Sequence, residues 1–179
     1  AIADGPGRLD SVVTCAGGGH APRLFHDLPD GAAEDILGQW LLGTVHTLRS
    51  AMPFLHAAGG GAIVTVASDA AKVPTPGEAV IGAAMAGIVM LTRTIAIEQA
   101  RAGIRANCLT PSLVDGTLTY QHVMSDPFAA RLFSKARDRA RLGLATPEDQ
   151  AAMVLFLLGP ESRRMTGQTI SINGGISAG

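Results

Sequence analysis

The chain has 179 residues, a formal net charge of −1 and a hydrophobic fraction of 47%. This length supports one sizeable core, so we expect a single domain over residues 1–179. The near-neutral charge and the absence of a basic run argue against a nucleic-acid partner.

Predicted strands and helices alternate along the chain, which is typical of a parallel α/β sheet. The predicted strands cover residues 10–16, 62–67, 104–109 and 169–173. The predicted helices cover residues 34–56 and 78–102, a polar helical segment covers 116–142, and a last helix follows Thr146. Gly103 is placed to end the second helix, and Thr146 with Pro147 is placed to begin the last one.

The most apolar segment, residues 79–97, is long enough to cross a membrane. Arg93 inside it, with Glu78 and Glu98 at its ends, favours a helix buried in protein instead. Neither a membrane span nor a signal peptide is therefore expected, and the predicted location is the cytoplasm. Cys15 and Cys108 lie on separate predicted strands and are expected to be buried free thiols.

Four segments resemble, in order and at matching separations, motifs of the short-chain dehydrogenase/reductase family. Residues 7–17, GRLDSVVTCAG, resemble its G-x-L-D-x-L-V-N-N-A-G near the cofactor, and residues 61–68, GAIVTVAS, resemble the strand that ends in its catalytic serine. Residues 105–112, RANCLTPS, resemble R-x-N-x-x-x-P-G, and residues 166–175, TGQTISINGG, match T-G-Q-x-x-x-x-x-G-G. The resemblance implies the C-terminal part of a Rossmann-like doubly wound parallel sheet, with about four strands.

The resemblance also shows which catalytic residues are replaced. Ser68 matches the family's serine, but Ile81 and Met85 stand where its Tyr-x-x-x-Lys is expected, and Trp40 stands for its asparagine. In the family the serine contacts the substrate carbonyl, the tyrosine transfers a proton and the lysine lowers the tyrosine pKa. Without the tyrosine, general acid catalysis worth roughly 10²–10⁴-fold is missing. Ser68 is then either the cap of a turn at a strand end or a residual substrate contact.

No nucleotide-phosphate site is expected. The sequence lacks the family's Gly-rich T-G-x-x-x-G-x-G turn, and glycines 17–19 follow the wrong strand to replace it. Only Ala16 and Gly17 match positions near the family's cofactor, and we expect NAD or NADP to bind a partner subunit rather than this chain. The strand over residues 10–16 should also form an open edge, which either is covered by another chain or by residues outside this sequence, or is avoided by a rearrangement of the strand.

The chain offers few replacements for the missing acid and base. Tyr120 is the sole tyrosine, the only lysines are Lys72 and Lys135, and no Tyr-x-x-x-Lys occurs. We expect Tyr120 to pack on the surface and Lys72 to be solvated. His20 and His26 are expected to be ordinary loop residues, although a Ser68–His–acid triad stays open, and the five histidines form no metal-type cluster.

Apolar substitutions at the former active site leave two possibilities. Ile81 and Met85 lie one helical turn apart, so together with Trp40 they either fill the pocket or line a hydrophobic ligand site. The small residues of the same helix form a surface suited to close helix packing. Because the matching helices make dimer contacts in the family, the resemblance implies that the chain pairs with another family member or with itself. The small residues are Gly82, Ala83, Ala84, Ala86 and Gly87.

Three functions follow as hypotheses. The first is a catalytically inactive subunit that pairs with an intact NAD(P)-dependent dehydrogenase in a hetero-oligomer. The second is a fragment, or a divergent oxidoreductase that uses Ser68 on a carbonyl or hydroxyl substrate. The third is a small-molecule binding module with an apolar pocket.

Overall fold

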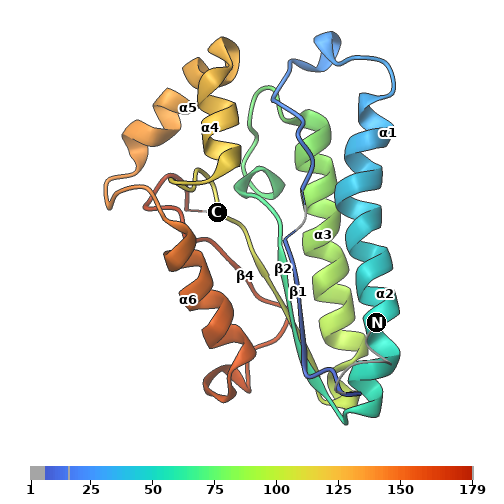
Figure 1. The fold of residues 1–179 in the computed structure, drawn as a ribbon. Helices are drawn as coiled ribbons and strands as arrows, with labels where there is room; N and C mark the ends of the chain where they lie inside the picture. The colour runs from blue at the N-terminus through green and yellow to red at the C-terminus, as the bar shows by residue number, and fades with distance from the viewer. Residues whose placement is uncertain (1–6, 16, 179) are drawn as a thin grey trace.

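The fold is a four-stranded parallel sheet between two layers of helices (Figure 1). A computed structural model describes residues 7–15 and 17–178. The strands are β1 (Ser11–Thr14), β2 (Gly61–Val66), β3 (Ile104–Leu109) and β4 (Thr169–Ile170), in that spatial order. Every neighbouring pair is parallel, which confirms the predicted α/β class.

Both faces of the central strands are buried, because helices cover each of them. Ile63 of β2 packs in a cluster with residues of α2 (Gly43–Ala57) and α3 (Ala79–Glu98), whereas Val64 packs with α6 (Pro147–Leu158). Successive side chains of a strand point to opposite faces, so the β-branched residues of β2 pack against both helical layers. Figure 1 shows α2 and α3 on one face, α6 on the other, and α4 (Leu118–Ser125) with α5 (Pro127–Arg139) beyond one end of the sheet.

Several predicted boundaries need correction. β1 ends at Thr14, and Cys15 is exposed beyond it, so the expectation that Cys15 is a buried thiol was wrong. Ala16 lies outside the described residues. β4 has two residues, because only Thr169 and Ile170 pair with β3. Cys108 is buried as expected, and burial raises the pKa of its thiol.

The predicted helix over residues 34–56 contains a wider turn. It consists of α1 (Ala32–Ile36), a π-helical segment, Leu37–Leu42, and α2. Trp40 lies in the π-helical segment, where an i→i+5 turn changes the direction of the side chains that follow. The expected helix start is confirmed at Thr146, which forms a capping box with Asp149. The long helix ends earlier than expected: α3 stops at Glu98, and Gly103, with φ of +72°, caps the 3₁₀ turn Ala100–Ala102 that follows it.

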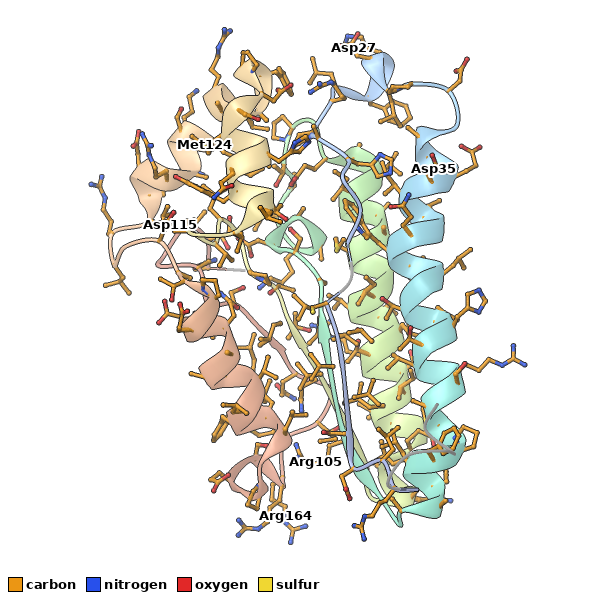
Figure 2. All side chains as sticks on the ribbon, viewed as in Figure 1. Asp27, Asp35, Arg105, Asp115, Met124 and Arg164 are labelled. Atoms are coloured by element: carbon orange, nitrogen blue, oxygen red, sulfur yellow. The ribbon has the colours of Figure 1, made fainter. Side chains whose placement is uncertain are left out.

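Two of the recognised motifs meet in one hydrogen-bond network. The Arg105 guanidinium donates to the carbonyls of Leu157 (2.9 Å) and Gly159 (3.2 Å) at the end of α6, at the lower end of the molecule in Figure 2. Asn107 donates to the Met165 carbonyl (3.1 Å) and accepts from the Gln168 backbone (3.0 Å). The R-x-N motif therefore satisfies polar groups at a helix end and fixes the turn that leads into β4.

Helix α3 is the described helix with the length and apolarity to cross a membrane, with mean hydropathy of 1.9. In this fold it packs on β3 and on the helices of its layer. Its small residues are divided: Ala84 is buried, Gly82 and Gly87 lie close to Ala70 and Leu41, and Ala83 is exposed. Part of the predicted small-residue surface is therefore used inside the domain.

Candidate functional site

Ser68 follows β2 at the carboxyl end of the sheet. Its backbone is extended, and its Oγ accepts a hydrogen bond from the Ala70 backbone N–H at 3.2 Å, which caps the 3₁₀ turn η3 (Asp69–Ala71). The prediction of a capping serine is confirmed. This bond uses one of the two acceptor positions of Oγ, and the hydroxyl proton can still be donated. Ser68 also lines a cavity.

Ile81, Met85 and Trp40 lie in one buried apolar cluster, with 7% of each residue exposed. Ala67, next to Ser68, and Cys108 belong to the same cluster. The Trp40 Nε1 is buried without a hydrogen-bond partner, and a Cβ placed on Gly17 would lie 3.0 Å from it. The indole therefore occupies the space beside Gly17, one of the candidate cofactor contacts.

Little space is left beside Ile81. The cavity that it lines, with neighbours such as Ile36 and Val80, has a volume of about 10 Å³. That is at most the room of one water molecule. The structure therefore agrees with the expectation that these side chains fill the pocket. It contradicts the alternative, because no space is left beside Ile81 for an apolar ligand.

A cavity of about 460 Å³ lies instead between the segment after Ser68 and helices α4 and α5. This volume is within the range of small-molecule sites. Its polar lining includes Ser68, Asp69, Glu78, Ser112, Lys135 and Arg139. Its apolar lining includes Val73, Leu113, Val123, Leu132 and Phe133.

Asp69 joins the C-terminal segment to this cavity. Its carboxylate accepts hydrogen bonds from the Ser177 hydroxyl (2.5 Å), Asn173 Nδ2 (3.3 Å) and the Ser171 hydroxyl (3.4 Å). Ser177 and Ile176 line the cavity, so these bonds fix one of its walls. A buried carboxylate that accepts several hydrogen bonds has its acceptor capacity met within the protein. We therefore assign Asp69 a structural role rather than a catalytic one.

Lys72 is part of the same network, and the expectation that it is solvated was wrong. Its Nζ donates to Ser171 Oγ at 2.5 Å and lies 3.8 Å from Asp69 Oδ1, and only 14% of its side chain is exposed. No local pattern indicates this contact, because Ser171 lies 99 residues further along the chain. Lys72 therefore helps to hold the C-terminal segment in place.

Glu78 is the residue that sequence reasoning missed. It immediately precedes α3, makes no capping hydrogen bond with its side chain, and lines the cavity. Burial of the carboxyl raises its pKa to about 7, because the charged form loses its hydration. The sequence did carry a signal for this placement. Glu78 ends the segment that connects Ser68 to α3, and both ends of that segment lie at the same edge of the sheet, so Glu78 could have been expected near Ser68.

The other candidate residues lie elsewhere. Tyr120 is half-buried on α4, and His20 packs its ring edge against Trp40, with ring centroids 6.1 Å apart. His26 is exposed near Asp27. No group of three or more His, Cys, Asp or Glu residues in the described part of the chain is arranged to hold a metal ion.

Comparison with known proteins agrees with this architecture. A short-chain type dehydrogenase/reductase from Mycobacterium ulcerans superposes with a TM-score of 0.88 and 27% identity, over 98% of this chain and 62% of that one. A family model described as enoyl-(acyl carrier protein) reductase matches residues 1–177. The chain belongs to the short-chain dehydrogenase/reductase family.

Curated relatives in the family are oxidoreductases by name. An uncharacterised NAD-dependent oxidoreductase of Mycobacterium tuberculosis is 36% identical over 97% of this chain, and the 3-oxoacyl-[acyl-carrier-protein] reductase FabG of Chlamydia pneumoniae is 34% identical over 95%. This chain spans 66% of the length of each. The structure of a variant of ElxO with NADPH bound has a TM-score of 0.84 and 26% identity, over 98% of this chain and 70% of that one.

The side chains at positions 81 and 85, where the family resemblance predicts a nicotinamide-facing tyrosine and lysine, do not fit a nicotinamide group. The family's tyrosine and lysine are polar, whereas Ile81 and Met85 carry no hydrogen-bonding group and are buried in the core. The Trp40 indole lies against Gly17 as well. The polar side chains that remain at this end of the sheet surround the cavity beneath α4 and α5.

Proposed function

We propose that this chain is a catalytically inactive subunit of the short-chain dehydrogenase/reductase family, paired with an intact family member that binds NAD or NADP. The observation that carries the proposal is the packing of Ile81 and Met85 with Trp40 in a closed apolar cluster. Proton transfer to a carbonyl oxygen needs an ionisable group within hydrogen-bond reach. Neither Ile81 nor Met85 supplies one.

Exposed apolar residues on α3 support an assembly. Met90 and Ile97 are 59% and 77% exposed, and they lie two turns apart along the outer side of this helix. Ala83 and Ala86, at the preceding positions of that side, are exposed and small. Exposed Arg93 and Thr94 lie between Met90 and Ile97 on this side, so the surface combines apolar and polar groups. A surface of this kind is suited to packing against another helix.

Native mass spectrometry of the protein purified from its own source tests the proposal, with the same sample then denatured. We expect a complex between this chain and a heavier family member, with NAD(P)-dependent activity in the complex only. A chain heavier than 18.3 kDa would identify this sequence as part of a longer protein. Assembly with copies of itself alone, or turnover by the isolated chain, would contradict the proposal.

A matched pair of variants locates the interface. The double variant Met90→Glu with Ile97→Glu places charges on the outer side of α3 and should abolish the complex. Leu142→Glu is the control, because Leu142 is 89% exposed and lies away from this helix. Equal effects of the two changes would exclude α3 as the contact surface.

A second candidate function is carbonyl or hydroxyl chemistry that uses Ser68. It is favoured by one observation, that Ser68 lines the 460 Å³ cavity with a hydroxyl proton left to donate. Its test is turnover of a carbonyl substrate by the isolated chain, with loss in Ser68→Ala. Turnover that survives Ser68→Ala would exclude this candidate.

A further inference from the structure

Asn173, in the segment after β4, is followed by a glycine that the fold requires. Gly174 has φ of +65°, and a Cβ at this position would overlap the Gly143 carbonyl oxygen. Glycine is also the residue that hinders a reaction at its own backbone nitrogen least, because it carries no side chain beside that atom. The structure therefore places an unhindered backbone nitrogen next to the Asn173 side chain.

The groups that an attack on the Asn173 amide needs are in place around it. The Gly174 N–H donates to no described residue, so no hydrogen bond competes for this nitrogen. The Gly175 N–H donates to Asn173 Oδ1 at 3.0 Å, which makes the amide carbon more electrophilic and would stabilise an oxyanion. Asn173 Nδ2 lies 3.0 Å from the Ser177 hydroxyl oxygen, and this hydroxyl donates to Asp69. A hydroxyl in this position can pass a proton to a departing amine.

The reaction that this arrangement favours is deamidation of Asn173. The Gly174 nitrogen attacks the side-chain carbonyl carbon of Asn173 and forms a cyclic imide. The new N–C bond replaces the bond to Nδ2, the Gly174 N–H proton passes to the leaving amine through the Ser177 hydroxyl, and ammonia departs. Water then opens the imide at either carbonyl and leaves aspartate or isoaspartate at position 173.

Neither product fits the hydrogen bonds that hold the starting amide. Asn173 Nδ2 lies 3.3 Å from Asp69 Oδ2 and 3.3 Å from the Ser177 carbonyl oxygen, so a carboxylate oxygen in its place would face two acceptors. Asn173 is 5% exposed, so aspartate would also put a second negative charge beside Asp69 in a poorly hydrated site. Isoaspartate would lengthen the backbone next to Gly174, which is packed against Gly143.

The C-terminal segment depends on these contacts. Its Ser177 hydroxyl donates to Asp69 at 2.5 Å, and its Gly174 carbonyl accepts from the Leu142 backbone N–H at 3.1 Å, beyond the end of α5. Ser177 also forms part of the wall of the 460 Å³ cavity. Loss of the Asn173 amide would therefore loosen both this wall and the turn that follows α5.

We propose that Asn173 is a site of spontaneous deamidation, and that its conversion to aspartate or isoaspartate releases the C-terminal segment from Asp69. This inference goes beyond the proposed function. It is measured by mass and by amide exchange without turnover, so an inactive subunit and an enzyme would both show it.

The first experiment ages the folded full chain at mildly basic pH and maps its peptides by mass spectrometry. Asn107 is the internal control, because it is the only other asparagine of the chain and is followed by Cys108 instead of glycine. We expect Asn173 to gain the mass that replacement of an amide by an acid brings, with isoaspartate among the products. Asn107 should keep its amide.

A matched pair of variants tests the proton donor. Ser177→Ala removes the hydroxyl beside Asn173 Nδ2 and should slow the conversion. Ser171→Ala is the control, because the Ser171 hydroxyl also donates to Asp69, at 3.4 Å, but has no contact with Asn173 among the described residues. Equal rates in the two variants would overturn the role of Ser177.

The second experiment tests the release by amide exchange. Asn173→Asp reproduces the aspartate product, and exchange over residues 171–178 should be on the order of tenfold faster than in the natural chain. Adding Asp69→Asn to this variant exchanges the amide and the carboxylate between the two positions. The double variant should be better protected than either single variant, because the amide again faces a carboxylate.

Each outcome decides one part of the inference. Conversion of Asn173 only in the urea-unfolded chain, or equal conversion of Asn107, would overturn the site. Unchanged amide exchange in Asn173→Asp would overturn the release of the C-terminal segment. A double variant no better protected than the single variants would overturn like-charge repulsion at Asp69 as its cause.

Discussion

Two regions with opposite chemistry meet at the end of β2. Ala67 belongs to the closed apolar cluster of Ile81, Met85 and Trp40, whereas its neighbour Ser68 lines the cavity beneath α4 and α5. The first region carries apolar side chains at the positions where the resemblance predicts a polar pair, and these side chains fill it. The second region contains hydrogen-bonding side chains and a cavity of about 460 Å³. The difference shows that a closed apolar cluster and an open cavity with polar lining can lie side by side at the end of one strand.

The difference has a local physical cause. In the apolar cluster, α3 packs directly on the π-helical segment that carries Trp40, so large side chains fill the gap. At the cavity, helices α4 and α5 cover the sheet end from a distance, and the cap at Thr117 and the Arg23–Asp126 pair hold them in place. The following predictions test this contrast, from the largest expected effect to the smallest.

Restoring the family's pair should damage the apolar region rather than repair it. Ile81→Tyr with Met85→Lys places a hydroxyl and an ammonium group among buried apolar side chains. We expect a loss of roughly 4 kcal/mol or more in the free energy of unfolding, measured by urea denaturation. The control, Ile81→Leu with Met85→Leu, keeps the volume and should cost below about 1.5 kcal/mol.

The same double variant should also show no NAD(P)-dependent turnover by itself. Measurable turnover would contradict the inference that the apolar cluster around Ile81 and Met85 does not fit the nicotinamide group. A stability equal to that of the control would show that the apolar cluster is open to water, and the contrast between the two regions would disappear.

The cavity should make folding stability depend on pH through Glu78. The pKa of Glu78 is about 7 in the folded chain against a usual value of 4.5, so the folded state holds more protons between these values. The contribution of Glu78 is fully present below about pH 4.5 and is lost as the pH rises through about 7. It amounts to about 3 kcal/mol at most.

The measurement is the difference in free energy of unfolding between the natural chain and Glu78→Gln across this pH range. The natural chain should lose stability relative to the variant as the pH rises from about 5 to about 8. Glu148→Gln, on the exposed first turn of α6, is the control and should not follow that curve. A flat difference for Glu78→Gln would mean that water reaches the carboxyl freely.

The covering helices should respond to loss of a single cap. Thr117 Oγ1 accepts from the Tyr120 backbone N–H at 3.1 Å and donates to the Val114 carbonyl at 2.8 Å. Thr117→Ala should cost about 1 kcal/mol and speed amide exchange in α4 and α5 more than in α3. Gln121→Ala, an exposed change on the same helix, should stay within about 0.5 kcal/mol. Equal acceleration in α3 would show that the two regions open together.

Much of the fold could be predicted because its signals are local. The β-branched run of β2 and the helix start at Thr146 are set by neighbouring residues, and the structure confirms them. Gly103 adopts the left-handed conformation expected of a cap, but it caps the 3₁₀ turn after α3 rather than α3 itself. The shortened β4 and the exposure of Cys15 could not be predicted in this way. They depend on how far a strand's partner extends, which is decided by segments distant in the sequence.

The sequence by itself determined the order of strands and helices, the family resemblance and the absence of a Tyr-x-x-x-Lys. Only the tertiary structure decided that the Lys72 ammonium donates to Ser171, that Glu78 is desolvated, and that a cavity opens beneath α4 and α5. The physical reason is that patterning acts through neighbours along the chain. Desolvation and enclosed space arise only where segments separated by tens of residues are packed together.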